Sequence, residues 1–477
     1  MSMTMADTVS TPRTICASAM PPGSPHVPVV IVGAGACGLT AAILLRDANV
    51  ECLLLERDAQ PSGSTALSSG FIPAAGTRVQ AGQGIEDSPE QFAADIQAKA
   101  HGTAAPHLVT AYADAVGPAI DRLGDHGLVF SVLDDFLYPG HGVYRMHTLA
   151  QRTGAALVAA LTQAAIQAGA DLLCDARVTE LWVDESGRVM GVGYLRPDGA
   201  REVLACDVLL LACNGFGGNQ TMVAELLPEM RDATFAGHTG NDGSAIAWGR
   251  ALGCRLADLG GYQGHGSWAV PQGALITWAL MMEGGVQITA LGQRFHDETL
   301  GYSEASVKVL AQPGGVAWNV FDAPLLSLAR GFPDFCEAEA AGALKACADE
   351  TALADVLGCP LPALRQTLGG LQPGATGTDG RTFRRALQAP YFAVKVTGAL
   401  FHTQGGLDID SQCRVLREDG TSMPNLLAAG GAARGVSGNA VWGYLSGNGL
   451  LSAVGGGAIA AATAIQFLHS FNTSGSP

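Results

Sequence analysis

A glycine-rich turn between a short apolar strand and a helical segment constrains this chain most strongly. The run VVIV (Val29 to Val32) is β-branched and bounded by glycine, which is typical of a buried parallel strand. Gly33, Gly35 and Gly38 then form G-x-G-x-x-G at the start of LTAAILLRDA. We expect these glycines to permit the tight turn, close approach of a diphosphate, and helix–strand packing, with the helix N-terminus holding the anion.

A second apolar strand, ECLLLE, ends in Glu56, 18 residues after Gly38. An acidic side chain at this distance can accept hydrogen bonds from ribose hydroxyls, so the unit predicts a dinucleotide site. The loop that follows, AQPSGSTALSSGFIPAAGT, is crowded with glycines and hydroxyl residues. It could be a plain surface loop, but it suits the extended cofactor FAD better than NAD, with Ser64, Thr65, Ser69 and Gly70 as donors.

Further segments resemble the flavoprotein family of fumarate reductase and succinate dehydrogenase, which also includes 3-ketosteroid dehydrogenases. LLLACNGFGGNQTMVAELLP, HTGNDGSAIAWGRALGCRLADL, ALFHTQGGLDID and GNGLLSA follow in the order of that family. The resemblance implies an α/β, Rossmann-like FAD-binding domain that is discontinuous, with an inserted α+β substrate-capping domain. We therefore expect a disordered tail over 1–26, an FAD domain over 27–261 and 387–471, and a cap over 262–386.

The resemblance and the motif together predict a set of FAD contacts. The residues are Gly33, Gly35, Ala36, Cys37, Gly38, Glu56, Arg57, Ser64, Thr65, Ser69, Gly70, Val178, Asn214, Gly215, Asp242, Gly430, Gly447, Asn448, Leu450 and Leu451. Family members that attach FAD covalently carry a histidine in the loop equivalent to 62–76. This chain has none there, so we expect noncovalent FAD.

The substrate site differs from that of a fumarate enzyme, which clamps two carboxylates with arginines and histidines. His265 in YQGHGSW keeps the first histidine of the family, whereas Ser437 stands at the expected place of the second. The proton-delivering arginine of the family is replaced by Tyr302 in GQRFHDETLGYSEAS, and Tyr444 in GVSGNAVWGYLSGNG aligns with the second arginine. A dicarboxylate would lack partners in such a site.

Two tyrosines suit α,β-dehydrogenation of a cyclic ketone, either a ketosteroid or a smaller oxo-cyclohexane. Ketosteroid dehydrogenases resemble this pattern, which implies that Tyr302 is the base and that Tyr444, with N–H groups near Gly447, polarises the carbonyl. We expect His265 to hydrogen-bond the substrate or Tyr302, or to be structural. The other expected pocket residues are Thr277, Trp278 (in place of the glutamate of the family), His402, Gly405, Gly406 and Trp442.

Two alternatives remain open. The protein could reduce the activated C=C bond of an unsaturated carboxylate held by Arg145 or Arg434, although either arginine could instead lie at the surface or beside FAD. It could also be a flavin-bound redox or assembly partner without small-molecule turnover. The electron acceptor is not specified by the sequence.

Composition limits the partners. With 27 Lys+Arg against 43 Asp+Glu the net charge is −16, which argues against nucleic acid. The 11 cysteines form no CxxC pair, as expected of buried thiols in a reducing cytoplasm, and no metal site is expected. The uncharged stretch from Gly447 to Leu468 is long enough to span a bilayer. We expect it instead to be a buried helix against the cofactor, without an integral membrane segment.

Overall fold

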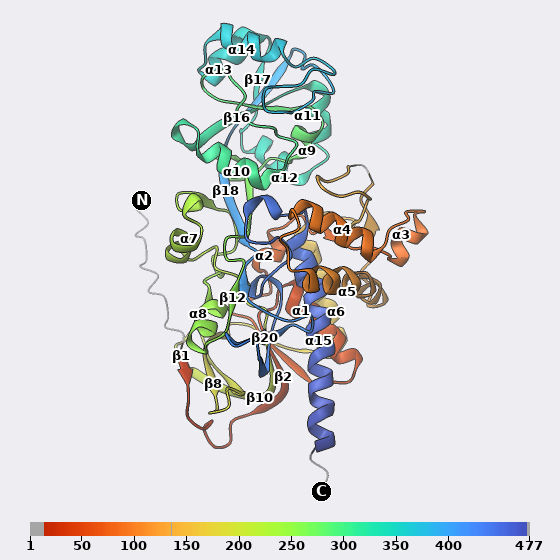
Figure 1. Cartoon of the computed structure of the whole chain (residues 1–477), viewed down its shortest axis with the longest axis vertical. Coiled ribbons are helices and arrows are strands. Elements are labelled where there is room, and N and C mark those ends of the chain that lie inside the picture. The colour runs from red at the N-terminus through yellow and green to blue at the C-terminus, as the bar shows by residue number, and fades with distance from the viewer. Residues whose placement is uncertain (1–13, 135, 475–477) are drawn as a thin grey trace.

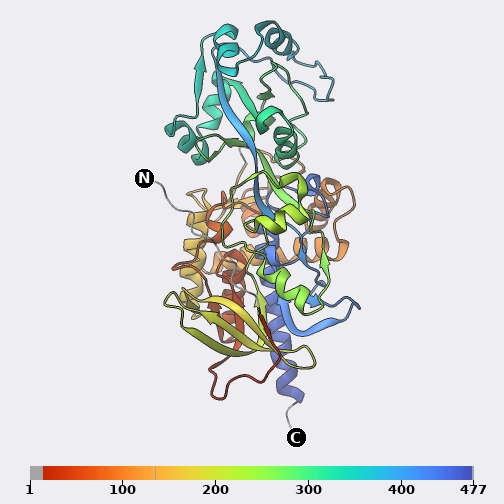
Figure 2. The same cartoon turned by 90° about the vertical axis from the view of Figure 1, so that its left-hand side faces the viewer.

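The computed structural model describes residues 14–134 and 136–474. Two parts are stacked along the long axis, a main domain and a cap domain, and both views show one long strand, β18, running between them (Figures 1 and 2). The expected Rossmann-like α/β domain with an inserted α+β cap is confirmed.

The main domain is built on a nine-stranded sheet whose central strands are parallel. Strand β10 pairs in parallel with β2 on one side and with β21 on the other, while its first half pairs antiparallel with β9. The sheet contains, in the order of its main path, β1 (Thr14–Cys16), β8 (Arg177–Val183), β9 (Val189–Leu195), β10 (Arg201–Leu211), β2 (His26–Val32), β3 (Cys52–Leu55) and β7 (Asp171–Leu173), together with β21 (Ser422–Ala428) and β20 (Arg414–Leu416).

Helices cover this sheet because β2 and β3 are apolar on both faces. Val29, Val30 and Ile31 are fully buried, as the β-branched run predicts. Helices α1 (Ala36–Asp47) and α15 (Asn448–Ser474) lie on the sheet, α6 (Gly154–Gln167) packs on α1, α5 (Pro106–Asp125) on α15, and α4 (Pro89–Lys99) on α5. Shorter elements complete the domain: α2 (Gly63–Ala66), α3 (Arg78–Gly82), α7 (Gln220–Leu226), α8 (Ser244–Ala251), β4 (Ile72–Pro73), β5 (Ser131–Val132), β6 (Met146–Thr148), β12 (Leu256–Ala257) and β19 (Gly406–Leu407).

The expectation of a disordered tail over 1–26 is wrong from Thr14 onward. Residues Thr14–Cys16 form β1, which pairs in parallel with Glu180 to Trp182 of β8 at the edge of the main sheet. The edge strand β8 has unpaired N–H and C=O groups, and the tail satisfies them. Residues 1–13 lie outside the described part of the chain.

The cap domain is a second sheet wrapped by short helices. Its strands, in order, are β14 (Ala274–Leu275), β13 (Tyr262–Ala269), β18 (Tyr391–Thr403), β16 (Val316–Asp322) and β15 (Val286–Ile288), with β11 (Thr234–Phe235) and β17 (Lys345–Cys347) also on β18. Its helices are α9 (Ala279–Met282), α10 (Tyr302–Leu310), α11 (Ala323–Ala329), α12 (Pro333–Ala340), α13 (Glu350–Leu357) and α14 (Leu361–Gly369).

The chain enters the cap at β13, where the sequence places the boundary, but it returns later than residue 387. Strand β18 pairs with β16 through Tyr391 to Thr397 and with β13 as far as Thr403. The returning boundary therefore lies within β18, because one continuous strand serves the cap sheet and delivers the chain to the main domain.

Among residues 14–134 and 136–474, one helix is long and apolar enough to cross a membrane by length and composition, Asn448–Ser470 in α15. Within its most apolar window 61% of the residues are buried inside the protein. Helix α15 packs against α1 and α5 in the main domain, so the segment is a largely buried helix, as the sequence predicts.

Candidate active site

One cavity joins the glycine-rich turn of the main domain to the tyrosines of the predicted substrate site. Its wall includes most of the predicted cofactor contacts and both predicted catalytic tyrosines. The predicted residues on the wall are Gly33, Gly35, Ala36, Cys37, Glu56, Arg57, Ser64, Thr65, Ser69, Val178, Asn214, Asp242, Gly430, Gly447, Leu450, His402, Tyr302 and Tyr444.

The turn between β2 and α1 needs its glycines for steric reasons. Gly33 has φ +108°, and a Cβ there would lie 2.6 Å from the carbonyl oxygen of Ala212. A Cβ on Gly38 would lie 2.0 Å from the carbonyl oxygen of Gly33. The main-chain N–H of Ala36 donates to Thr65 Oγ1 at 2.9 Å, which ties the hydroxyl-rich loop to the start of α1.

Glu56 directly follows β3, at the place that a dinucleotide-binding unit gives to its acidic residue. Its buried carboxylate accepts from the N–H groups of Ala34 (2.9 Å) and Asp58 (3.0 Å). Burial raises the pKa of Glu56, and the two N–H groups oppose that rise. The carboxylate therefore lies beside the glycine turn, where a ribose would reach it.

Polar side chains from three segments meet beyond Glu56. Ser64 Oγ accepts from the side-chain amides of Asn214 and Asn241, both at 2.9 Å. Asp242 pairs with Arg57 Nη1 at 3.2 Å and with Arg177 Nη2 at 3.4 Å. This wall is assembled from predicted residues together with Asn241 and Arg177, and its two arginines share one aspartate as an ion-pair partner.

Five predicted cofactor residues lie behind the wall. A Cβ on Gly70 would meet the carbonyl oxygen of Thr153 at 2.7 Å, and one on Gly215 would meet Thr403 Oγ1 at 2.0 Å. These glycines allow two segments to pack closely, and the other three fill the packing beneath the cavity. The five are Gly38, Gly70, Gly215, Asn448 and Leu451.

Tyr302 and Tyr444 face each other at the cap end of the cavity. Tyr302 begins α10, and its ring centroid lies 6.1 Å from that of Tyr444, with the planes at 60°. The His402 ring lies 5.6 Å from that of Tyr444. A Cβ on Gly449 would be 2.8 Å from that imidazole, so this glycine makes room for it.

Burial raises the pKa of both phenols. For Tyr302 the burial effect exceeds the opposite influence of the Ser446 and Tyr444 hydroxyls. For Tyr444 burial raises the pKa by more than the hydrogen bonds from the main-chain N–H groups of Gly449 and Gly447 lower it. Both tyrosines therefore carry their protons at neutral pH.

His265 supports Tyr302 from behind the cavity wall. The two rings are stacked with 4.8 Å between centroids and 19° between planes. The main-chain N–H of Ser267 donates to His265 Nδ1 at 3.1 Å, so Nε2 carries the proton. Burial lowers the pKa of His265 to about 3, which keeps the ring neutral. His265 thus contacts Tyr302 by stacking, and a hydrogen bond from it to Tyr302 or to the substrate stays a prediction.

Among the expected pocket residues, His402 lies on the wall and five others do not. Trp278 Nε1 donates to the carbonyl of Glu298 at 3.1 Å, and Trp442 stacks on His101 with 4.5 Å between centroids. These contacts use the indoles in the packing of the cap and of the main domain. The five are Thr277, Trp278, Gly405, Gly406 and Trp442.

Several wall residues escaped the sequence analysis. They come from β13, β14, β18 and the residue after it, from β6, from the segments before β4 and β6, and from the turn after Tyr444. Some lie within segments that resemble the family, but at positions to which the resemblance gives no role. The ones at the tyrosine end are Gln263, Leu275, Phe401, Gln404 and Ser446, with Phe71, Tyr138 and Met146 also on the wall. The site histidine near Tyr444 is His402; Ser437 instead accepts from Asn448 Nδ2 at 2.9 Å in the packing.

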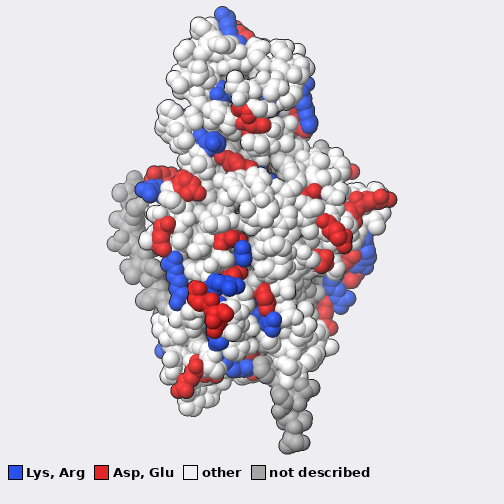
Figure 3. Space-filling view, viewed as in Figure 1, with Lys and Arg blue, Asp and Glu red and all other residues white. Residues whose placement is uncertain are grey.

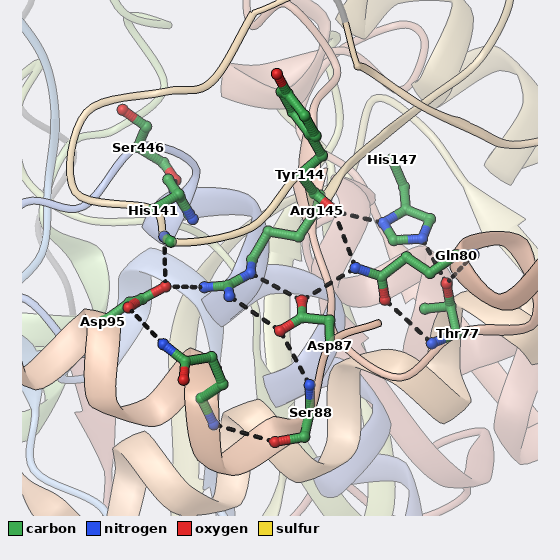
Figure 4. Close-up of polar contacts among 12 residues, drawn as sticks. Thr77, Gln80, Asp87, Ser88, Asp95, His141, Tyr144, Arg145, His147 and Ser446 are labelled. Atoms are coloured by element: carbon green, nitrogen blue, oxygen red, sulfur yellow. Dashed lines mark hydrogen bonds and ion pairs between the residues drawn. The ribbon is translucent and has the colours of Figure 1, made fainter. Parts of the chain in front are cut away.

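The two arginines considered as carboxylate ligands are already paired. Arg145 is buried, with Nε and Nη2 each 3.0 Å from Asp87 and Nη1 2.7 Å from Asp95 (Figure 4). Arg434 Nε lies 2.6 Å from Asp258, and neither arginine is on the cavity wall. The expectation that Arg145 could be a surface residue is wrong, because two acidic side chains draw it into the interior.

Comparison with known proteins places this chain in a family. The FAD-binding domain profile matches residues 28–450. A probable fumarate reductase of Shewanella frigidimarina is 27% identical over 442 residues, covering 91% of this chain and 74% of that protein. The open form of a flavocytochrome c3 fumarate reductase superposes with a TM-score of 0.78 at 27% identity, covering 93% of this chain and 79% of that one.

A 3-ketosteroid-Δ4-(5α)-dehydrogenase from Rhodococcus jostii RHA1, solved with 4-androstene-3,17-dione, shares the fold with a TM-score of 0.76 at 24% identity. The match covers 95% of this chain and 99% of that one. Fold and site thus define an FAD-binding oxidoreductase. The chain belongs to the FAD-binding domain family, with fumarate reductases among its relatives.

The residues present fit FAD. Gly33 to Cys37 and Glu56 form the dinucleotide end of the cavity, and Gly447, Gly449 and Leu450 lie on the same wall beside His402 and Tyr444. The cavity is therefore continuous between a diphosphate-binding turn and the tyrosine pair. FAD, when bound, supplies a hydride acceptor to this end of the site.

Proposed function

We propose that this protein catalyses FAD-dependent α,β-dehydrogenation of a neutral cyclic ketone, with FAD held noncovalently. The observation that carries the proposal is the pair Tyr302 and Tyr444, which face each other in the cavity that holds the dinucleotide motif. Among the described wall residues, the arginines and lysines are Arg57 and Arg177, both paired with Asp242. A substrate carboxylate would have no cationic partner beside the tyrosines.

Tyr444 suits the role of carbonyl donor. The N–H groups of Gly447 and Gly449 donate to its phenol oxygen, and its hydroxyl proton is directed toward Tyr302, whose place as acceptor a ketone oxygen would take. Because burial keeps the phenol protonated, it can donate to a ketone oxygen and stabilise the negative charge that develops there. The main-chain N–H groups would then act through Tyr444 and would not contact the ketone directly.

Tyr302 is proposed to take the α-proton. Tyr302 would take the proton of the α C–H bond on its oxygen, and FAD, when bound, would supply the acceptor for the β-hydrogen and its electron pair as the C=C bond forms. Tyr302 can accept this proton only as the phenolate. Because burial raises its pKa, the phenolate is a small fraction at neutral pH. Stacked His265 fixes the plane of the Tyr302 ring during this transfer.

The same raised pKa favours a second candidate, the reverse reaction on a neutral enone. A buried, protonated Tyr302 is suited to delivering a proton to the α-carbon while hydride adds at the β-carbon. Reduction of an unsaturated carboxylate has less support, because Arg145 and Arg434 are occupied by Asp87, Asp95 and Asp258.

Anaerobic mixing of the FAD-loaded protein with a substrate panel tests the proposal. We expect cyclohexanone or a 3-ketosteroid to bleach the flavin absorbance near neutral to alkaline pH, and succinate to leave it unchanged. Bleaching by succinate alone would remove the ketone proposal. Chemically reduced enzyme that is reoxidised by cyclohex-2-en-1-one but by no saturated ketone would favour the reverse reaction. Release of all flavin on denaturation checks that FAD is noncovalent.

A further inference from the structure

We infer that His141 is a positioning residue that holds the turn from Tyr444 to Gly447 in place for cofactor and substrate. The substrate half of this inference rests on the proposed role of Tyr444, while the cofactor half does not. His141 belongs to the loop between β5 and β6, which has no place in the proposed reaction itself. No sequence motif marks it.

The contact is a single directed hydrogen bond. His141 Nε2 lies 2.9 Å from the carbonyl oxygen of Ser446 (Figure 4). A carbonyl oxygen only accepts, so Nε2 carries the proton and donates it. The other ring nitrogen, Nδ1, is buried and has no partner among the described residues. Burying an unpaired nitrogen is unfavourable, so burial of this imidazole costs free energy. The hydrogen bond from Nε2 to Ser446 is the contact that the fold gains by placing the ring there.

The loop that carries His141 is anchored from below by ion pairs. Gly142, the next residue, donates its N–H to Asp95 Oδ2 at 2.8 Å, and the same oxygen lies 2.7 Å from Arg145 Nη1. Arg145 is held in turn by Asp87, whose side chain is fully buried with it. Figure 4 shows His141 directed toward Ser446 while the Arg145 cluster lies beside the helix that carries Asp95.

Packing reinforces the hydrogen bond. A Cβ added to Gly140, which has φ +85°, would lie 2.7 Å from Leu445 Cδ1. Leu445, between the two wall residues Tyr444 and Ser446, is fully buried. The turn is therefore fixed to the loop through one side chain and through the next carbonyl, and cannot slide past it without opening a gap.

The position of this turn affects the site because three of its four residues form part of the cavity wall. Tyr444, Ser446 and Gly447 all lie there, and the Ser446 hydroxyl acts on Tyr302. Movement of the Ser446 carbonyl would displace both tyrosine hydroxyls from each other and shift Gly447 against the cofactor. His141 would thus influence cofactor and substrate affinity without touching either.

The test uses three variants of the full-length protein. His141→Phe keeps a ring and removes the donor, His141→Gln retains an N–H donor, and His107→Phe is the control. His107 also bonds a main-chain carbonyl, that of Ile409 at 3.1 Å, and it lies on α5 and not on the cavity wall. Two dissociation constants are measured: that of FAD from the reconstituted apoprotein, and that of cyclohex-2-en-1-one from changes in flavin absorbance.

We expect His141→Phe to weaken FAD and cyclohexenone binding each by about tenfold, as the loss of one positioned hydrogen bond implies. His141→Gln should recover most of both affinities, and His107→Phe should change neither. FAD affinity in His141→Phe equal to that of the parent overturns the inference, as does an equal loss in His107→Phe. Should the parent bind no ketone, the proposed function fails, while the FAD measurement still decides the role of His141.

Discussion

The phenol ring of Tyr302 lies stacked on the imidazole of His265, with 4.8 Å between ring centroids and 19° between planes. The first residue of α10 thereby meets a residue of β13, so helix and sheet of the cap jointly orient the hydroxyl. The contact leaves the Tyr302 hydroxyl on the cavity wall and the neutral imidazole behind it.

Removing the Tyr302 hydroxyl should slow flavin reduction without loss of bound FAD. Tyr302→Phe preserves the stack on His265 and should lower the rate of flavin reduction by a cyclic ketone by about 10²–10⁴, with FAD content unchanged. Anaerobic stopped-flow absorbance measures the rate. Tyr391→Phe, on β18 and away from the cavity wall, serves as the control. A Tyr302→Phe rate equal to that of the parent would show that Tyr302 does not take the proton.

The rate of dehydrogenation should rise steeply with pH into the alkaline range. Burial raises the pKa of Tyr302, so its deprotonated fraction grows about tenfold with each pH unit below that pKa. Dehydrogenation should therefore accelerate with a slope near one in log rate from about pH 6 to 9. The reverse reaction needs the protonated phenol and should be flat over this range. A plateau in the dehydrogenation rate near neutral pH contradicts a Tyr302 base.

Gly33 in the glycine turn should tolerate no side chain. Gly33→Ala places a Cβ 2.6 Å from the Ala212 carbonyl oxygen at a φ of +108°, so the turn must open and the diphosphate site is lost. We expect FAD affinity to fall by at least about tenfold, measured by reconstitution of the apoprotein. Gly124→Ala, in α5 with no atom within 4 Å, should leave FAD binding intact. Equal flavin content in both variants would refute the assignment.

The Arg145 cluster should contribute to stability and not to carboxylate binding. Arg145→Met leaves Asp87 and Asp95 without a cation, and we expect a loss of about 3–5 kcal/mol in the free energy of unfolding. Adding Asp87→Asn and Asp95→Asn should restore part of it. Arg330→Met, which breaks an exposed pair with Glu339, should cost at most about 1 kcal/mol. Urea denaturation compares the variants; selective loss of carboxylate binding in Arg145→Met would contradict us.

Acid should destabilise the fold through buried histidines. Burial lowers the pKa of His141, His147 and His402 to about 4 and that of His265 to about 3. Between these values and about 6.5 the unfolded chain binds protons that the folded chain does not, so stability is full above that range and falls with pH through it. Each histidine contributes a slope of up to about 1.4 kcal/mol per pH unit.

Urea denaturation of His147→Gln between pH 7 and 5 tests this assignment. The slope of the free energy of unfolding against pH should decrease, relative to the parent, by the amount that uptake of one proton contributes. Thr162→Val, which removes a hydroxyl and no titratable group, should leave the slope unchanged. An unchanged slope in His147→Gln would mean that this imidazole is not held neutral in the folded state.

The nucleotide half of the site was readable from local sequence because its determinants are close together in the chain. Gly33, Gly35 and Gly38 lie within six residues of one another, and Glu56 directly follows the next strand. The family motifs located the tyrosines as well. Ser446 and His141 carried no such signal, since their roles depend on a contact across 305 residues.

The chain alone therefore determined an α/β FAD-binding fold, because alternating strand and helix patterns with a glycine turn allow few other arrangements. Only the tertiary structure decided that Thr14–Cys16 is an edge strand, that Trp278 and Trp442 are packing residues, and that Arg145 is buried between two aspartates. Burial and charge pairing are properties of what surrounds a side chain, and those surroundings come from segments that the sequence keeps far apart.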